Sequence, residues 1–337
     1  MTSSTMTGTS SRLWLDAGHG AHQGPVVEAV DGYHVIDCEA CRFKHVVPLP
    51  VQGQLQDVYE QDYYSTEKPF YIEQYQTDRD WWNAVYAQRY EFLERQLPPS
   101  RRRLLDVGSG PGLFLAHGRD RGWQTKGIEP SRQAAAYSQS QLGLDVLHAF
   151  LDRQTASGLG KFDAINMGEV LEHLPEPAQM LSLAHELLEE DGLLCLIVPN
   201  DFNPFQTLLN RRLGFRPWWV APPHHLNYFD QGSLAELVER CGFAILRQET
   251  TFPIDMFLLM GENYIDDPQL GRTCHRRRMK FEQNLLEQGG GDLLGSLYQA
   301  FARLNLGREI VLFARRSAHA DALPPARGDA GHRRPPP

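Results

Sequence analysis

Short apolar runs alternate with longer amphipathic stretches along the middle of the chain. The apolar runs predict five strands, over 102–107, 124–128, 145–149, 162–167 and 193–198. The amphipathic stretches predict helices over 111–121, from Ser131 to about Gly143, and from Pro177 to Asp191-Gly192. Strands that alternate with helices of this length predict a parallel sheet covered on both faces, with ligands at the carboxyl ends of the strands.

A long aromatic loop follows the fifth strand. It spans 199–230, and loops of this length inside a folded domain are usually functional. Beyond it, Ser233-x-x-Glu236 has the form of a capping box that opens a helix ending at Cys241-Gly242. Two further strands, over 243–250 and 309–315, enclose a helical insertion at 252–305 that suits a cap or a dimer contact.

Changes of pattern divide the chain into an N-terminal extension, a helical segment, a main α/β domain and a tail. The expected bounds are 1–52, 53–100, 101–317 (with the insertion at 252–305) and 318–337. Apolar positions between 82 and 97 give the second part a helical stripe. The tail is rich in Pro, Arg and Ala, and we expect it to be disordered.

Composition narrows the function classes. A chain of 337 residues with 42% hydrophobic residues can bury one full core with additions at either end. The longest apolar run, Leu193 to Val198, is too short to span a membrane, and Thr2 to Ser11 lacks the apolar region of a signal peptide, so we expect a cytoplasmic protein. The net charge is −9 and the arginines form only short clusters, which disfavours nucleic acid as a partner.

The first predicted strand ends in a glycine-rich turn, Asp106-Val107-Gly108-Ser109-Gly110-Pro111-Gly112. Alternating glycines permit positive φ and let a ligand approach the backbone, and the following helix offers unpaired N–H groups. The turn therefore suits a nucleotide-like ligand. Leu113 replaces the third glycine of the dinucleotide fingerprint, and the Gly-Lys-Ser/Thr ending of a phosphate-binding loop is missing.

Three features together resemble class I S-adenosylmethionine (SAM)-dependent methyltransferases of the bacterial small-molecule type. These are the Asp-x-Gly-x-Gly-x-Gly turn, Glu129 at the end of the next apolar run, and the segment from Phe162 to Leu174. The resemblance implies a Rossmann-like sheet of seven strands, mostly parallel with the last one antiparallel, and SAM as cofactor. It also implies that the segment before the glycine strand is a lid, for which Tyr63, Tyr64 and Tyr71 are candidates.

The resemblance also assigns cofactor contacts. Asp106 and the glycine turn would face the methionine end of SAM, and Glu129 would take the ribose hydroxyls. The full set of expected cofactor-binding residues is Asp106, Gly108, Ser109, Gly110, Gly112, Glu129, Pro130, Phe150, Asn166 and Glu169.

Methyl transfer from a sulfonium is an in-line displacement, so the protein mainly has to align acceptor, methyl and sulfur. A hydroxyl acceptor also needs a base or a metal ion, whereas an amine only has to be neutral. The candidate catalytic residues near the expected site are His224, His225, His173 and Tyr228. For the histidines, substrate orientation and packing remain open as alternatives to base catalysis.

Two acceptor classes are disfavoured by the residues after the fourth strand. Asn166-Met167-Gly168-Glu169 lacks the Asn/Asp-Pro-Pro-aromatic motif that stacks a flipped base, and no cysteine nucleophile lies nearby. The leading hypothesis is O-methylation of a small molecule or glycan intermediate by a monomer or homodimer. The alternatives are C-methylation of a nucleotide-linked keto-sugar, which co-purifying zinc would favour, and a non-catalytic SAM-binding scaffold.

Cys38-Glu39-Ala40-Cys41 has the spacing of a zinc knuckle. A zinc ribbon needs a second cysteine pair, and no other Cys-x-x-Cys occurs, so nitrogen ligands would have to come from His19, His22, His34 or His45. Some relatives of the resembled group carry a complete N-terminal zinc module. Two interpretations therefore stay open: a bound zinc ion, or a degenerate knuckle held by packing.

Overall fold

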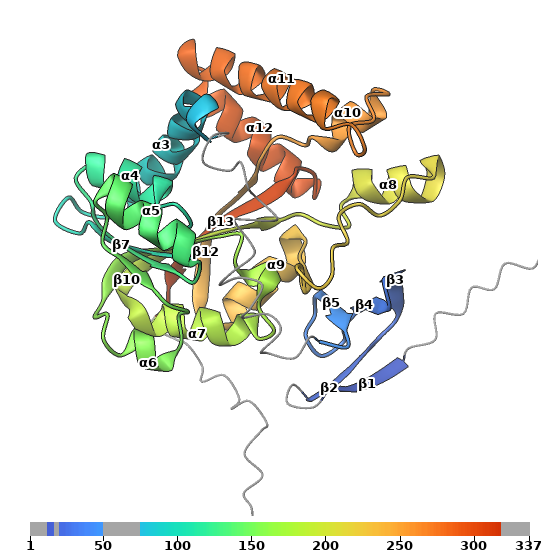
Figure 1. Cartoon of the computed structure of the whole chain (residues 1–337), viewed down its shortest axis with the longest axis horizontal. Coiled ribbons are helices and arrows are strands. Elements are labelled where there is room, and N and C mark those ends of the chain that lie inside the picture. The colour runs from blue at the N-terminus through green and yellow to red at the C-terminus, as the bar shows by residue number, and fades with distance from the viewer. Residues whose placement is uncertain (1–11, 17–19, 50–74, 318–337) are drawn as a thin grey trace, which may run out of the picture.

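Among the residues that the structure describes, seven strands form the central sheet. The structure is a computed structural model and describes residues 12–16, 20–49 and 75–317 (Figure 1). The strands are β6 (Arg103–Val107), β7 (Gln124–Glu129), β8 (Val146–His148), β9 (Phe162–Gly168), β10 (Leu188–Pro199), β12 (Phe243–Thr250) and β13 (Glu309–Arg316). Their order is β12-β13-β10-β9-β6-β7-β8, and β13 runs antiparallel to both of its neighbours. The predicted fold class, with the last strand antiparallel, is confirmed.

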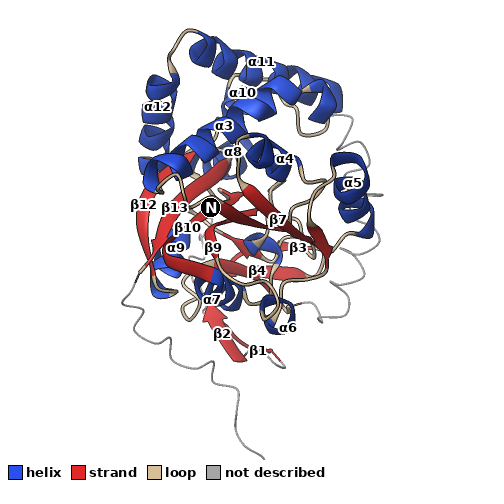
Figure 2. Cartoon of the chain, turned by 90° about the vertical axis from the view of Figure 1, so that its left-hand side faces the viewer, coloured by secondary structure: helices blue, strands red, loops and turns tan. Residues whose placement is uncertain are grey.

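Helices cover both faces of the sheet (Figure 2). One face packs against α3 (Arg79–Gln96), α4 (Leu113–Asp120) and α5 (Arg132–Leu142), and the other against α6 (Arg153–Ala156), α7 (Pro177–Leu187) and α9 (Gln231–Arg240). Successive side chains of a strand point to opposite faces, so Leu104 joins the first core and Leu105 the second. This explains why the strands read as continuous apolar runs.

The predicted helical insertion between the last two strands is confirmed. It consists of α10 (Asp255–Leu259), α11 (Pro268–Glu287) and α12 (Gly291–Arg303), drawn in orange at the top of Figure 1. Helix α11 packs on α3, where Trp81 donates its indole N–H to the buried carboxylate of Glu282. The insertion therefore covers the helix that precedes the glycine strand.

The N-terminal extension is a small β module. A hairpin of β1 (Arg12–Asp16) and β2 (Gly20–Gly24) precedes β3 (Val26–Val30), β4 (Tyr33–Asp37) and β5 (Lys44–Val47). Strand β5 also pairs with β11 (Asn227–Tyr228), which belongs to the loop after β10, and the sheet order is β11-β5-β4-β3. The loop after β10, which also contains α8 (Pro204–Leu213), is thus joined to the N-terminal module.

Two predicted helix boundaries are wrong. Helix α9 is capped by Asp230, whose carboxylate accepts the N–H of Ser233 at 2.8 Å, so Ser233 lies inside the first turn and is not the cap. Helix α7 ends at Leu187 rather than at Asp191-Gly192, because β10 already begins at Leu188 and is irregular up to Leu193. The expected tail and the candidate lid residues Tyr63, Tyr64 and Tyr71 lie outside the described residues.

Within the described ranges, none of the helices combines the length and apolar character that a membrane span requires.

Candidate functional site

The glycine turn between β6 and α4 depends on backbone conformations that favour glycine. Gly108, Gly110 and Gly112 have φ values of +69°, +53° and +79°. A Cβ on Gly108 would lie 2.7 Å from Val170, and one on Gly112 would lie 2.6 Å from Leu144. Neighbouring side chains of the protein therefore leave no room for a Cβ at Gly108 and Gly112, whether or not a ligand is bound.

Glu129, at the end of β7, holds the turn in place. Its Oε2 accepts the N–H of Gly110 and its Oε1 accepts the N–H of Ser131, both at 2.7 Å. Burial raises the pKa of Glu129 to about 7, and the two N–H bonds oppose this rise. Each carboxylate oxygen keeps a further lone pair that a ribose hydroxyl can use.

Asp106 and Asn166 lie side by side on adjacent parallel strands. The amide of Asn166 donates to Oδ1 of Asp106 at 2.6 Å. Burial raises the pKa of Asp106 to about 7; the Asn166 bond and the charge of Arg89 oppose the rise, and the charge of Glu129 adds to it. The Asn166 Oδ1 atom is buried and has no hydrogen-bond partner among the described residues. A buried acceptor next to a carboxylate fits a cationic ligand group such as an ammonium.

The remaining expected cofactor residues surround this edge in different ways. Ser109 donates its N–H to the Ile128 carbonyl, and its hydroxyl oxygen would lie 2.7 Å from a Cβ on Gly127. The Pro130 carbonyl lies 3.0 Å from Nε2 of His148. Phe150 is half-buried two residues after β8, and Glu169 is exposed directly after β9 with a φ of +55°.

A carboxylate and two imidazoles meet just beyond β9. Glu172 and His173 belong to the short helix η2 (Leu171–His173), and His225 comes from the loop after β10. One ligand-type atom of each lies within 4.8 Å of the others. Oε1 of the buried Glu172 is 3.8 Å from Nε2 of His173, and the rings of His173 and His225 meet edge to face at 5.0 Å.

His224 and Tyr228 have different places from His225. The carbonyl of His224 accepts a bond from Nδ1 of His173 at 2.7 Å, and its side chain is not part of the cluster. Tyr228 is buried, its hydroxyl donates to the carbonyl of His225 at 3.0 Å, and burial raises its pKa. These contacts favour a positioning role for Tyr228 and for the backbone of His224.

Two important residues were not singled out from the sequence. Glu172 lies within the segment from Phe162 to Leu174, and the spacing Glu169-x-x-Glu172-His173 was the available signal. Asn227 donates its side-chain amide to the carbonyls of Leu171 and Leu174, at 2.8 and 2.7 Å, and thereby joins the loop to η2. Nothing local in the sequence marks Asn227 for this task.

The cysteine pair of the N-terminal module also has neighbours. His22 and His45 lie against Cys38 and Cys41, whereas His34 is outside this group and His19 is outside the described residues.

Comparison with known proteins identifies the family to which the chain belongs. The sequence model of a family described as "Methyltransferase domain" matches residues 75–248, more than half of the chain. The chain belongs to this methyltransferase family. The resemblance to class I SAM-dependent methyltransferases drawn from the sequence is thereby confirmed, and the match runs from α3 into β12 without the N-terminal module.

The similar curated proteins include ubiquinone biosynthesis O-methyltransferases. The one from Xanthomonas axonopodis pv. citri is 28% identical over 134 residues, which are 36% of this chain and 56% of the relative. The one from Aromatoleum aromaticum is 25% identical over 126 residues, or 33% and 54%. The chain thus spans about half the length of the curated relatives it matches.

Among solved structures, a magnesium protoporphyrin IX methyltransferase from Synechocystis PCC 6803 with bound SAH is similar at a TM-score of 0.49. The two share 16% identity, and the similarity covers 79% of this chain and 100% of the other. A SAM-dependent methyltransferase from Archaeoglobus fulgidus has a TM-score of 0.45 and 15% identity, covering 69% of this chain and 93% of the other.

Proposed function

We propose that the protein binds SAM at the carboxyl edge of the sheet and methylates a hydroxyl group of a small molecule or glycan intermediate. The observation that carries the proposal is the Glu172–His173–His225 cluster. It directly follows β9, and Val170 of the same segment packs against the glycine turn at Gly108. Groups able to activate a hydroxyl thus lie beside the expected cofactor site. The names of the curated relatives support O-methylation.

The residues at the edge fit SAM. Glu129 offers acceptors to ribose hydroxyls, and Asp106 with the unpaired Oδ1 of Asn166 offers acceptors to the methionine ammonium. Bound SAM supplies an electrophilic methyl group on a sulfonium. The protein's part is to hold the acceptor oxygen in line with that methyl, exclude water and remove the hydroxyl proton.

The cluster offers two ways to remove that proton. Nδ1 of His173 bonds to a carbonyl, which only accepts, so Nδ1 carries a hydrogen, and in the neutral imidazole Nε2 has a lone pair facing the Glu172 carboxylate. Two acceptors facing each other suit a shared divalent cation, and a carboxylate with two imidazoles is a suitable ligand set. Without a cation, His225 is the proposed base, oriented by Tyr228 through its carbonyl.

The test compares three single variants, His225→Gln, His173→Gln and His224→Gln. SAH formation is measured with a panel of phenolic, catecholic and sugar acceptors, and SAM affinity is measured by calorimetry. We expect turnover to fall ~10²-fold or more in the first two variants with unchanged SAM affinity, because only proton removal is impaired. His224→Gln is the matched control, since His224 contributes its backbone.

The other outcomes have distinct signatures. Near-normal turnover in all three variants contradicts the role of the cluster. Product analysis that places the methyl on carbon supports keto-sugar C-methylation, and SAM binding without SAH formation on any acceptor supports the scaffold alternative. Loss of turnover in EDTA with recovery on adding Mg²⁺ supports the cation mechanism. If the turnover of the parent rises with pH around neutrality and this rise is absent in His225→Gln, the result supports His225 as the base.

A further inference from the structure

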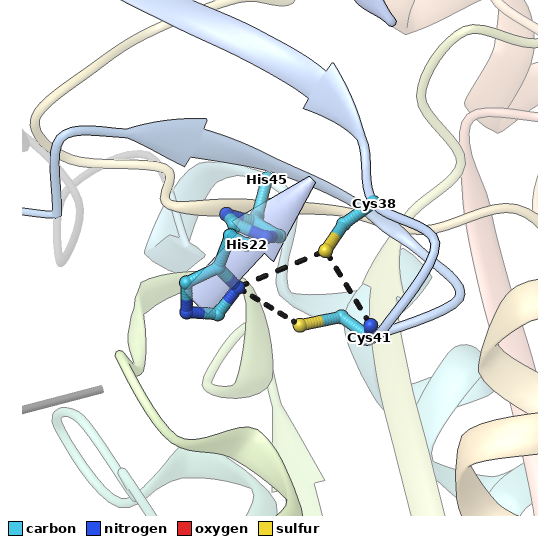
Figure 3. Close-up of side chains that lie close together, drawn as sticks. All are labelled: His22, Cys38, Cys41 and His45. Atoms are coloured by element: carbon cyan, nitrogen blue, oxygen red, sulfur yellow. Dashed lines mark hydrogen bonds between the residues drawn. The ribbon is translucent and has the colours of Figure 1, made fainter. Parts of the chain in front are cut away.

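Four metal-ligand side chains converge in the N-terminal module (Figure 3). His22 comes from β2, Cys38 and Cys41 from the turn after β4, and His45 from β5. One ligand atom of each lies within 4.8 Å of all the others. His22, Cys38 and His45 are buried and Cys41 is partly buried, so the four meet away from solvent. The sequence had left the nitrogen ligands open among His19, His22, His34 and His45.

The spacing of these atoms suits a tetrahedral zinc ion. Nδ1 of His22 lies 3.7 Å from Sγ of Cys38 and 3.4 Å from Sγ of Cys41. Zinc bond lengths of about 2.3 Å to sulfur and about 2.0–2.1 Å to nitrogen, at tetrahedral angles, separate S and N by about 3.6 Å. The side chains therefore need only small adjustments to bind one ion.

Surrounding bonds prepare the ligands for a metal. Nδ1 of His45 lies 2.9 Å from the carbonyl of Val46, so it carries the hydrogen and leaves the lone pair on Nε2. This Nε2 is buried without a hydrogen-bond partner among the described residues. The N–H of Cys41 points at Sγ of Cys38 at 3.5 Å, which favours a sulfur that carries negative charge.

We propose that His22, Cys38, Cys41 and His45 bind one structural Zn²⁺. Two thiolates and two imidazoles select zinc over magnesium or calcium, and four protein ligands leave no open position for chemistry. Co-purifying zinc was expected to favour keto-sugar C-methylation, but a closed structural site takes no part in the chemistry, so zinc content alone does not decide between O-methylation and C-methylation. The residues lie before the region that matches the methyltransferase family, so the site is a property of this chain's own extension.

The ion would fix the register of the loop that carries His225. His45 is paired directly with Asn227 across β5 and β11, and the N–H of Val46 donates to the carbonyl of Leu226 at 2.9 Å. Asn227 in turn bonds the carbonyls on either side of Glu172 and His173. A continuous set of contacts thus connects the proposed zinc site, through β5 and β11, to Asn227 and to the segment that carries Glu172 and His173.

The experiment measures metal content of the full-length protein by mass spectrometry after desalting, without any substrate. We expect about one Zn²⁺ per chain in the parent and in the control His34→Gln, whose residue lies on β4 outside the four ligands. In Cys41→Ser and His45→Ala we expect the zinc content per chain to be lower by about ninefold or more. Chelator treatment followed by Co²⁺ should give the visible absorption of tetrahedral thiolate-bound cobalt. Chelation should also lower the melting temperature of the parent but not of Cys41→Ser.

A parent that holds no zinc after refolding with excess Zn²⁺ and gives no cobalt spectrum overturns the proposal. A zinc content equal to that of the parent in Cys41→Ser or in His45→Ala also overturns the proposal. The result is independent of the methyltransferase activity. If the zinc site and the methyltransferase activity both hold, Cys41→Ser should keep its SAM affinity and lose acceptor turnover, because the glycine turn lies in the region that matches the methyltransferase family and the four zinc ligands lie before it.

Discussion

Glu129 has a structural task in addition to the one that the sequence resemblance assigned to it. Its carboxylate was expected to bind ribose, and the structure shows that it also accepts the N–H groups of Gly110 and Ser131. Each bond joins a charged acceptor to a backbone donor, a type worth about 1.5–3 kcal/mol. The residue therefore shapes the turn before any ligand binds.

Replacing Glu129 separates these tasks. Glu129→Ala should lose both the ribose contact and the bracing of the turn, so SAM affinity should fall at least ~10²-fold and the free protein should also unfold at lower denaturant. Calorimetry and urea unfolding measure the two effects. Glu186→Gln, on the exposed side of α7, is the control. A variant with weakened binding and parent-like stability would mean that the backbone bonds contribute little.

The two buried carboxylates predict how SAM binding depends on pH. In the free protein the pKa values of Asp106 and Glu129 are both raised to about 7 by burial. A cation near Asp106 and hydroxyl donors at Glu129 favour the ionised forms, so binding should lower both pKa values. Below pH 7 protons must leave before SAM binds, and the Kd should rise by up to ~10-fold per pH unit for each carboxylate.

Calorimetry between pH 8 and pH 5.5 measures this dependence, and repeating it in buffers of different ionisation enthalpy counts the protons released. Proton release should be near zero at pH 8 and should increase toward pH 6. An affinity that stays constant over this range would show that the carboxylates do not interact with the ligand as assigned.

At the scale of elements, the side-chain amide of Asn227 joins η2 to the loop after β10, where we propose that the acceptor binds. Asn227→Ala should free the carbonyls of Leu171 and Leu174, at a cost of about 1–3 kcal/mol for each group left unsatisfied. Turnover should fall ~10-fold or more and the acceptor KM should rise, while SAM affinity stays within about twofold. Asn210→Ala on α8, which removes one bond to the Phe215 carbonyl, is the control. Equal effects in both variants would contradict a specific role for Asn227.

The central sheet could be predicted because its signals are local. The apolar run at 104–107, the glycines and the Ser131 cap each act within a few residues, and β6, α4, β7 and α5 lie close to their expected positions. The capping error at Ser233 has a local cause as well. Asp230-x-x-Ser233 and Ser233-x-x-Glu236 are overlapping candidates, and the structure uses the earlier one because the side chain of Ser233 accepts the N–H of Asp230.

The acceptor side and the metal-ligand cluster were harder to predict because their contacts are distant in sequence. Strand β11 has only two residues and pairs with β5 about 180 positions away, so no periodic pattern marks it. His22 and His45 reach the cysteines only through the pairing of β strands, whereas His34 and His19 were equally near in sequence. The pairing of strands that are distant in sequence thus decides which histidines join the cysteines, a choice that the sequence spacing left open.

At the scale of the whole molecule, the two additions support the methyltransferase domain at different places. The N-terminal strands hold the loop after β10, and the insertion packs on α3 at the top of Figure 1. At the start of α3 the buried carboxylate of Asp78 binds two side chains of α11. Arg272 donates to both of its oxygens, at 3.1 and 3.4 Å, and Nε2 of His275 lies 3.2 Å from Oδ2.

This contact predicts that the insertion is a part of the folded core rather than an independent appendage. Burial lowers the pKa of His275 to about 4, so at neutral pH its imidazole is uncharged and donates Nε2–H, and Arg272 supplies the positive charge. Asp78→Asn keeps the size of the side chain but loses the charge and one acceptor. Because Arg272 is one-third exposed, we expect a loss of about 1–3 kcal/mol in unfolding free energy rather than the full cost of a buried ion pair.

Urea unfolding at pH 7.5 compares Asp78→Asn with Asp80→Asn, an exposed carboxylate two residues along the same helix. The first variant should unfold at lower urea in a single transition, because α3, α11 and the sheet share one packed core, and the second should match the parent. Limited proteolysis gives an independent readout, since local opening of α11 would expose its Arg276 to Arg278 run to trypsin. If trypsin cleaves α11 in Asp78→Asn while the urea unfolding transition keeps the midpoint of the parent, the insertion opens on its own and does not belong to the core of the domain.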